Sequence, residues 1–294
     1  MLENLERTEI EDFKPKNELN PDIWHNDMLD SRVRLKLMDL ADDFIDTLDI
    51  RWVKPEDVII TGSMANYNWN DFSDVDVHVV MDYSKVYKDK DFVKSYFDAK
   101  KDLWKDEHPR LKVFGFPVEM YVEDSKNPSK AGGVYSLNKN EWLKKPEEMD
   151  AEDVDYDKIE RKAVDIMDDV DELVGKLKNE KDLKKCDVVS GKLDKLFDKL
   201  KSERKKALAT KERELSPWNI IWKVLRAEGY LDKIINAINR NYDRQNSVNE
   251  CRTVMVNETQ FQNCFKSTTA ELKIQRLARL GNLTFRRLTT LSGG

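Results

Sequence analysis

The sequence predicts an α+β fold, in which a small mixed β-sheet with packed helices is followed by an all-α helical region. Short apolar runs alternate with helix-like segments in the first half, whereas later apolar residues recur only at helical spacing. A chain of 294 residues is also long enough for two domains. We therefore expect a polar N-terminal arm (1–20), a first domain (21–149), a helical domain (150–247) and a C-terminal tail (248–294).

The elements expected in the first domain follow from apolar periodicity and from turn residues. The first helix is indicated by one apolar face that comprises Leu29, Val33, Leu37, Leu40 and Phe44. Gly115 and Pro117 interrupt the third strand region, which predicts a bent strand or a hairpin there. The expected order is a helix over about 21–48, a strand at 58–60, a short helix after Ser63, a strand at 75–81, a helix at 91–104, the bent strand at 111–122 and a further strand at 134–137.

The second region is expected to be helical throughout. Apolar residues spaced by seven in 159–177 and 186–200 predict an antiparallel helical hairpin that turns near 179–182. Ser216 and Pro217 predict the N-cap and first position of a further helix. Gly229 interrupts the apolar pattern, which then resumes, and the tryptophans of this segment are expected to be core residues.

Composition limits the classes of protein to which the chain can belong. Charged residues make up 37% and the mean hydropathy is −0.72, with no apolar run near the roughly 18 residues of a membrane span. We therefore expect no membrane partner. The three cysteines lack zinc-ligand spacing and the first residues lack an apolar signal core, so we expect a reducing, cytoplasmic location.

Two aspartates within the second expected strand are the most informative feature. Side chains alternate across a strand, so Asp74, Asp76 and His78 share one face while Val75 and Val77 fill the other. Adjacent carboxylates repel each other and are costly to desolvate, whereas a divalent cation such as Mg²⁺ prefers oxygen ligands. The pattern therefore predicts a metal site. For His78, contact with a ligand and a purely structural role both remain open.

These residues, together with the turn before them, resemble a known superfamily. Ile60 and Gly62-Ser63 are followed, after a spacer of about ten residues, by Asp74-Val75-Asp76-Val77. This pattern is similar to the DNA polymerase β-like nucleotidyltransferases, although Thr61 stands between the apolar residue and the glycine. The resemblance covers roughly residues 30–145.

The superfamily also requires a third carboxylate on a later strand. Glu119 lies between apolar residues in the third strand region and is the preferred candidate. Glu123 shares its face but lies at the strand end, and Asp124 is expected to begin a loop. Glu123 is the next choice.

The resemblance implies an enzyme that transfers NMP from an NTP, with ATP expected, to a hydroxyl acceptor and releases pyrophosphate. Asp74, Asp76 and Glu119 would be the catalytic residues and would hold two Mg²⁺ (or Mn²⁺) ions about 4 Å apart. Gly62 and Ser63 would bind the nucleotide phosphates.

A narrower resemblance concerns predicted nucleotidyltransferases encoded by large bacteriophages. It rests on the segments 62–68, 76–78 and 214–231. If the chain is phage-encoded, the expected location is the host cytoplasm.

Charge distribution bears on the acceptor. Residues 1–150 hold 33 of the 57 acidic and 22 of the 51 basic side chains, so the first half is acidic and the second slightly basic. A small molecule, an RNA end and a protein hydroxyl all remain possible acceptors, and the basic helical half offers a surface for RNA. The alternatives to an enzyme are a regulatory or antitoxin-like module that modifies or inhibits a partner protein, and a catalytically inactive nucleotide-binding scaffold.

Overall fold

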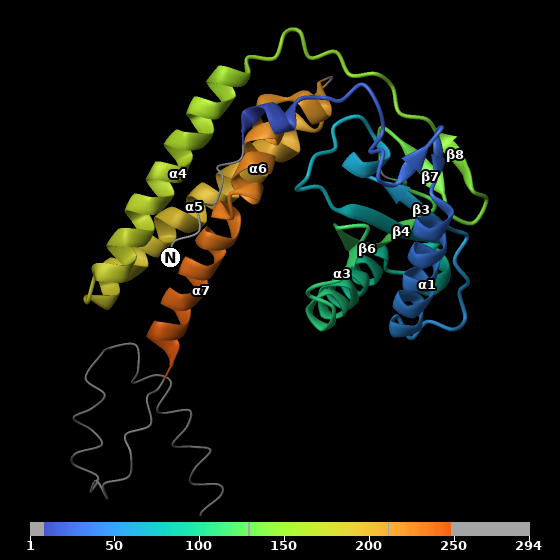
Figure 1. The fold of residues 1–294 in the computed structure, drawn as a ribbon. Coiled ribbons are helices and arrows are strands. Elements are labelled where there is room, and N and C mark those ends of the chain that lie inside the picture. Colours follow the sequence, from blue (N-terminus) through green and yellow to red (C-terminus); the bar gives the residue numbers. More distant parts are fainter. Residues whose placement is uncertain (1–8, 129, 211, 248–294) are drawn as a thin grey trace, which may run out of the picture. The chain divides into compact units, whose positions relative to one another are not determined.

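The computed structural model describes residues 9–128, 130–210 and 212–247 (Figure 1). The chain divides into two compact units, residues 1–242 and 243–294. The fold described here is that of the first unit. Of the described residues, only 243–247, at the end of the last helix, belong to the second unit. The predicted tail, 248–294, lies outside the described residues, so that prediction stays untested.

A six-stranded mixed sheet forms the centre of the first half, which confirms the predicted α+β class. Its spatial order is β5-β6-β4-β3-β7-β8, with β4 and β6 parallel and every other neighbouring pair antiparallel. The sequence did not predict the edge strand β8. The strands are β3 (Asp57–Thr61), β4 (Val75–Met81), β5 (Lys112–Val113), β6 (Phe116–Asp124), β7 (Val134–Ser136) and β8 (Glu141–Lys144).

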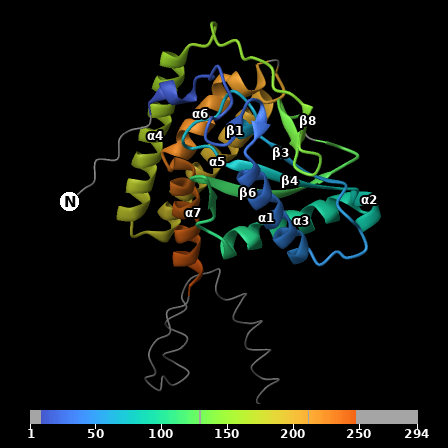
Figure 2. The same ribbon diagram turned by 45° about the vertical axis from the view of Figure 1, so that its right-hand side comes forward.

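Helices cover one face of this sheet. α1 (Ser31–Thr47) and α3 (Lys90–Glu107) lie on the same side of β4 and β6 in both views (Figure 1, Figure 2), and a short α2 (Tyr83–Val86) precedes α3. The β4 residues that point to this side, Val75, Val77 and Val79, are fully buried in a core shared with α1 and α3. The opposite face therefore carries the polar side chains of β4.

The prediction that the first helix begins near Pro21 was wrong. Residues before Asp30 form a small hairpin of β1 (Trp24–His25) and β2 (Met28–Leu29). Asn26 and Asp27 both have positive φ (52° and 63°), as a tight two-residue hairpin turn requires. The carboxylate of Asp30 then accepts hydrogen bonds from the amides of Arg32 and Val33 and starts α1.

The third strand region is a hairpin, one of the two predicted forms. Phe114 (φ 50°) and Gly115 (φ 90°) make the turn between β5 and β6, and Pro117 lies opposite Lys112 near the edge of the sheet. The short helix expected after Ser63 is a single 3₁₀ turn, Ser63–Ala65.

Beyond residue 155, every regular element in the described part of the chain is helical, as predicted for the second half. The hairpin turns at 180–182, where the Asp182 carboxylate accepts hydrogen bonds from the first amides of the second helix. Its elements are α4 (Tyr156–Asn179), α5 (Leu183–Ala207), a 3₁₀ turn (Arg213–Leu215), α6 (Pro217–Ala227) and α7 (Tyr230–Asn246).

Two local details qualify the predictions. Ser216 occupies the N-cap position of α6 and Pro217 its first position, as predicted, although the Ser216 hydroxyl donates to the Arg213 carbonyl and caps no amide. The N-terminal segment is also not wholly irregular, because Ile10–Phe13 forms a 3₁₀ turn and Phe13 is buried among the helices.

The apolar residues gather in two clusters, one around the sheet and one among the helices. The segment 145–155 connects β8 to α4, and its Ala151 and Val154 pack against the helical cluster. The predicted domain boundaries stay a prediction. No helix in the described residues is long and apolar enough to cross a membrane.

Candidate metal centre on the polar face of the sheet

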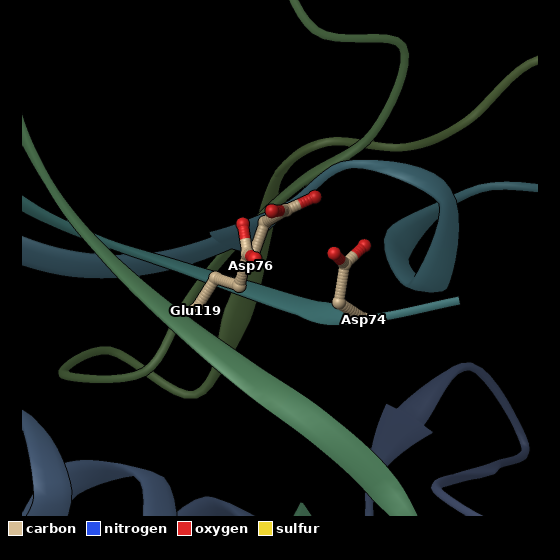
Figure 3. Close-up of side chains that lie close together, drawn as sticks. All are labelled: Asp74, Asp76 and Glu119. Carbon is tan, nitrogen blue, oxygen red and sulfur yellow. The ribbon is translucent and has the colours of Figure 1, made fainter. Parts of the chain in front are cut away.

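Three carboxylates converge where β4 begins. Asp76 lies directly between Thr61 of β3 and Glu119 of β6 in the strand register, and Asp74 is the residue immediately before β4. Each of Asp74, Asp76 and Glu119 places a carboxylate oxygen within 4.8 Å of the others (Figure 3). The structure thus brings together the three side chains that the sequence singled out.

The alternative third carboxylates have other partners. Glu123 lies four residues further along β6, and its Oε2 lies 2.6 Å from Nδ1 of His78. Asp124 accepts hydrogen bonds from Lys90 Nζ (2.8 Å) and from the amide of Tyr83. His78 shares the face of Asp76 as predicted, but the structure shows it paired with Glu123 and tilted against the ring of Tyr121 (centroids 4.8 Å apart).

The Gly-Ser turn closes over Asp76. Gly62 follows β3 with a φ of 75°, and a Cβ atom built on it would lie 1.9 Å from Oδ2 of Asp76. Only a glycine permits both this conformation and this approach. Ser63 comes next, and its hydroxyl donates a hydrogen bond to the hydroxyl of Ser73 (3.0 Å), directly before Asp74. The turn and the aspartate pair are therefore packed against each other.

The carboxylates perturb one another. Burial is the main cause that raises the pKa of Asp76 to about 8, and the negative charges of Asp74 and Glu119 add to the increase. Arg226 and Lys223 act in the opposite direction. A buried acid with two acidic neighbours is unfavourable in an isolated fold, and a bound cation would relieve this repulsion.

Both carboxylate oxygens of Glu119 accept hydrogen bonds. Burial alone would raise its pKa, but hydrogen bonds from Lys105 Nζ (2.5 Å) and from the Tyr121 hydroxyl (2.5 Å) outweigh burial and lower it. Burial, with Asp76 and Glu119 nearby, raises the pKa of Tyr121, so this phenol stays a donor. The carboxylate is thereby kept ionised and fixed in orientation.

Basic side chains from α6 complete the site. Arg226 donates from Nη1 to Oδ2 of Asp74 (3.2 Å), and Lys223, one turn earlier, pairs with Glu214 (3.2 Å). Both cations line a small pocket beside Ser63; its lining residues are Phe13, Ser63, Asn68, Asn70, Phe72, Ser73, Lys223 and Arg226. Asn68 is one of these lining residues, and its buried Oδ1 has no hydrogen-bond partner among the described residues.

Sequence reasoning missed Lys105, Tyr121, Lys223 and Arg226. Tyr121 alone carried a usable signal, because it follows Glu119 by two residues and so shares its strand face. The α6 cations lie about 150 residues from Asp74 in the sequence, and only the packing of helices and sheet brings them to it.

The donor set suits a hard divalent cation. All three converging groups are carboxylates, and oxygen-only sites favour Mg²⁺, Mn²⁺ or Ca²⁺ over metals that prefer nitrogen or sulfur. Asp74, Asp76 and Glu119 could therefore bind a divalent metal ion.

Comparisons with known proteins add little. No family model matches the chain, and no curated protein matches it. A solved structure, the STING-associated CdnE c-di-GMP synthase from Capnocytophaga granulosa, is similar over 76% of this chain and 90% of its own, with 12% identity and a TM-score of 0.20. So low a TM-score carries no weight for function.

Proposed function

We propose that the protein is a metal-dependent nucleotidyltransferase, which transfers NMP from an NTP to a hydroxyl acceptor and releases pyrophosphate. The observation that supports this most is the convergence of Asp74, Asp76 and Glu119 beside the Gly62-Ser63 turn. A carboxylate cluster that suits Mg²⁺, next to a small pocket lined by cations, is what binding of a triphosphate requires. ATP as the donor remains an expectation.

The carboxylates and the Gly-Ser turn would have separate roles. Asp74, Asp76 and Glu119 would hold Mg²⁺ or Mn²⁺, which when bound neutralises phosphate charge and lowers the pKa of the acceptor hydroxyl. Ser63 and the backbone amides of its turn would donate hydrogen bonds to the phosphates.

Lys223 and Arg226 would neutralise the triphosphate from the helical side. Arg226 already contacts the centre through Asp74, and both cations line the pocket beside Ser63. A guanidinium is well suited to phosphate because it donates two parallel hydrogen bonds.

In the proposed reaction, one phosphorus–oxygen bond forms as another breaks. The acceptor oxygen bonds to the α-phosphorus while the bond from that phosphorus to the bridging oxygen breaks, and pyrophosphate leaves. Glu119, kept ionised by Lys105 and Tyr121, is placed to take the hydroxyl proton. Most of the rate enhancement would come from positioning and charge neutralisation. An inactive scaffold is not favoured, since all three carboxylates are present and converge.

The test is incubation with each α-³²P-labelled NTP, Mg²⁺ or Mn²⁺, and separate pools of nucleotides, RNA, proteins and small molecules. Asp76→Asn keeps size but removes a metal-binding charge, so transfer should fall about 10³-fold. Ser63→Ala should lose less, because the backbone amides persist. Asp71→Asn, an exposed residue of the preceding loop, is the matched control. Unchanged transfer by a correctly folded Asp76→Asn protein would refute the proposal.

A further inference from the structure

Residues from two distant parts of the chain contact the turn that carries Ser63. Within this turn, Ser63–Ala65, the side chains of the last two residues are fully buried. The indole of Trp24, in β1, donates a hydrogen bond to the turn, and Gly132-Gly133, directly before β7, approaches it closely. We call Trp24, Gly132 and Gly133 the turn clamp.

The indole of Trp24 fixes one peptide of the turn. Its Nε1 donates to the carbonyl oxygen of Met64 at 2.7 Å, and both residues are buried. The carbonyl and the amide of one trans peptide point in opposite directions. A fixed Met64 carbonyl therefore also fixes the direction of the Ala65 amide, which is one of the turn amides that would donate to phosphate in the proposed function.

The ring of Trp24 is itself fixed by two aromatic neighbours. It stacks on Trp142 of β8, with centroids 4.7 Å apart and an interplanar angle of 21°, and it meets Tyr135 of β7 edge-on at 5.1 Å. Trp142 Nε1 in turn donates to the carbonyl of Asp27 at the tip of the β1–β2 hairpin (2.7 Å). The hairpin is thus fastened to the outer strands of the sheet, and Trp24 reaches Met64 from a rigid base.

The two glycines of the clamp lie against the end of the same turn. A Cβ atom built on Gly133 would lie 1.9 Å from the carbonyl oxygen of Ala65, and one built on Gly132 would lie 2.3 Å from Nδ2 of Asn66. The hydroxyl of Thr61, at the end of β3, donates to the Gly133 carbonyl (3.2 Å) and holds this segment in place. The residues that follow Ser63 are therefore packed against a fixed backbone.

The clamped turn is directly continuous with the site. Gly62, one residue before the turn, closes over the carboxylate of Asp76, and the hydroxyl of Ser63 donates to that of Ser73. A shift of the Met64 peptide would move Ser63 away from these contacts. A site whose donors are already oriented binds its ligand more tightly, because less conformational freedom is lost on binding.

We infer that Trp24 is a positioning residue for the NTP, whose indole N–H holds the turn so that Ser63 and the turn amides meet the phosphates. The inference rests on the proposed function. In this role Trp24 acts through Met64 and takes no part in the bond changes. Its loss should therefore weaken nucleotide binding more than it slows the chemical step.

Binding of α,β-methylene-ATP with Mn²⁺, measured by isothermal titration of the full-length protein, tests this role apart from catalysis. Trp24→Phe keeps an aromatic ring and removes the donor, so the dissociation constant should rise about tenfold, as expected for one hydrogen bond. Trp142→Phe is the matched control, because it also removes an indole N–H that donates to a carbonyl at 2.7 Å, but that carbonyl belongs to Asp27. Its dissociation constant should stay within about twofold of the parent's.

Steady-state kinetics supply a readout that a simple loss of stability would not produce. In the α-³²P transfer assay, with the same acceptor pool throughout, Trp24→Phe should raise the KM for ATP about tenfold and change kcat by less than about threefold. A partly unfolded enzyme would instead lower kcat at an unchanged KM.

A second variant reaches the clamp from β3. Thr61→Val has a side chain of similar shape but frees the Gly133 carbonyl, so the dissociation constant of the analogue should rise several-fold. If Trp24→Phe fails to fold, this variant decides the matter.

The outcomes separate the positioning role from the proposed function. Parental affinity for the analogue in folded Trp24→Phe, or in Thr61→Val where that protein does not fold, would overturn the role and leave the function standing. Equal weakening in Trp24→Phe and Trp142→Phe would also overturn it. Binding that depends on Trp24 without NMP transfer to any pool would support the role and refute the function. A parent that does not bind the analogue would refute both.

Discussion

Gly62 shows how one residue couples backbone conformation to the metal centre. Its φ is 75°, and an added Cβ would meet Asp76 at 1.9 Å. We expect Gly62→Ala to displace the Asp76 carboxylate, to destabilise the fold by about 1–3 kcal/mol and to weaken Mn²⁺ binding strongly. Urea unfolding and Mn²⁺ titration would measure both effects.

Gly229 supplies the control for that substitution. Its φ is 72°, but nothing lies within 4 Å of an added Cβ. Gly229→Ala therefore shares the backbone strain without the clash and should leave Mn²⁺ binding unchanged. Equal Mn²⁺ affinity in both variants would show that the contact with Asp76 does not matter.

Asp76 should make the metal-free protein sensitive to pH. Its pKa is about 8 in the folded protein and about 3.9 when unfolded. The folded state thus holds a proton that the unfolded state has lost, so this group's contribution to stability is full below about pH 4 and is lost as pH rises through about 8. Asp76→Asn should therefore gain stability relative to the parent as pH rises.

Urea unfolding in EDTA at pH 5 and pH 8.5 measures that difference. The free energy of unfolding of Asp76→Asn relative to the parent should increase by a few kcal/mol between the two pH values. A constant difference would show that Asp76 ionises normally. Millimolar Mn²⁺ should reduce the pH dependence of the parent, because it binds the ionised carboxylates.

Tyr121 is expected to act as a positioning residue. Its hydroxyl and Lys105 together hold Glu119, so Tyr121→Phe should weaken Mn²⁺ binding about tenfold while folding persists. Tyr96→Phe is the matched control, because the Tyr96 hydroxyl donates instead to the Leu48 carbonyl. Isothermal titration of both variants with Mn²⁺ decides the matter, and equal affinities would rule out the positioning role.

At the scale of elements, α3 depends on its N-cap. The Asp89 carboxylate accepts hydrogen bonds from the amides of Asp91 and Phe92, both at 3.1 Å. Asp89→Ala should therefore lower the free energy of unfolding by about 1 kcal/mol. Asp106→Ala, an exposed acid in the last turn of the same helix, should change it by less than about 0.5 kcal/mol. Urea unfolding of the two variants gives the comparison, and equal values would contradict the capping role.

Local sequence signals explain why β4 was predicted and the β1–β2 hairpin was not. β4 was predicted with its observed bounds, because alternation of valine with polar residues is a strong local signal. The hairpin β1–β2 was read as the start of a helix, since Leu29 fitted the helical spacing by chance. The positive φ values of Asn26 and Asp27, which decide that turn, leave no periodic signal in the sequence.

At the scale of the first unit, Glu214 joins the helical half to the loop that precedes β4. Its Oε2 accepts hydrogen bonds from Asn68 (3.0 Å) and Asn219 (3.1 Å), and it pairs with Lys223. Over a third of its side chain remains exposed, so Glu214→Ala should cost only about 1–2 kcal/mol of stability. It should also reduce the thermal stabilisation by α,β-methylene-ATP with Mn²⁺, because Lys223 loses its position beside the pocket.

Glu160 on α4 offers the control. It is exposed, and its removal should affect neither stability nor the shift in melting temperature caused by the nucleotide analogue. An unchanged shift in Glu214→Ala would show that the helical half does not contribute to nucleotide binding.

The sequence by itself determined the α+β class, the helical hairpin and the carboxylate pair Asp74 and Asp76, because each is encoded in local periodicity or in alternation along one strand. Glu119 was added because the superfamily that the sequence resembles requires a third carboxylate on a later strand. The sequence could not reveal that Lys105 reaches Glu119, or that Arg226 reaches Asp74. Those contacts arise from the packing of α3 on β6 and of α6 beside the sheet. Contacts between residues far apart in the chain depend on how whole elements pack, and no local pattern records that packing.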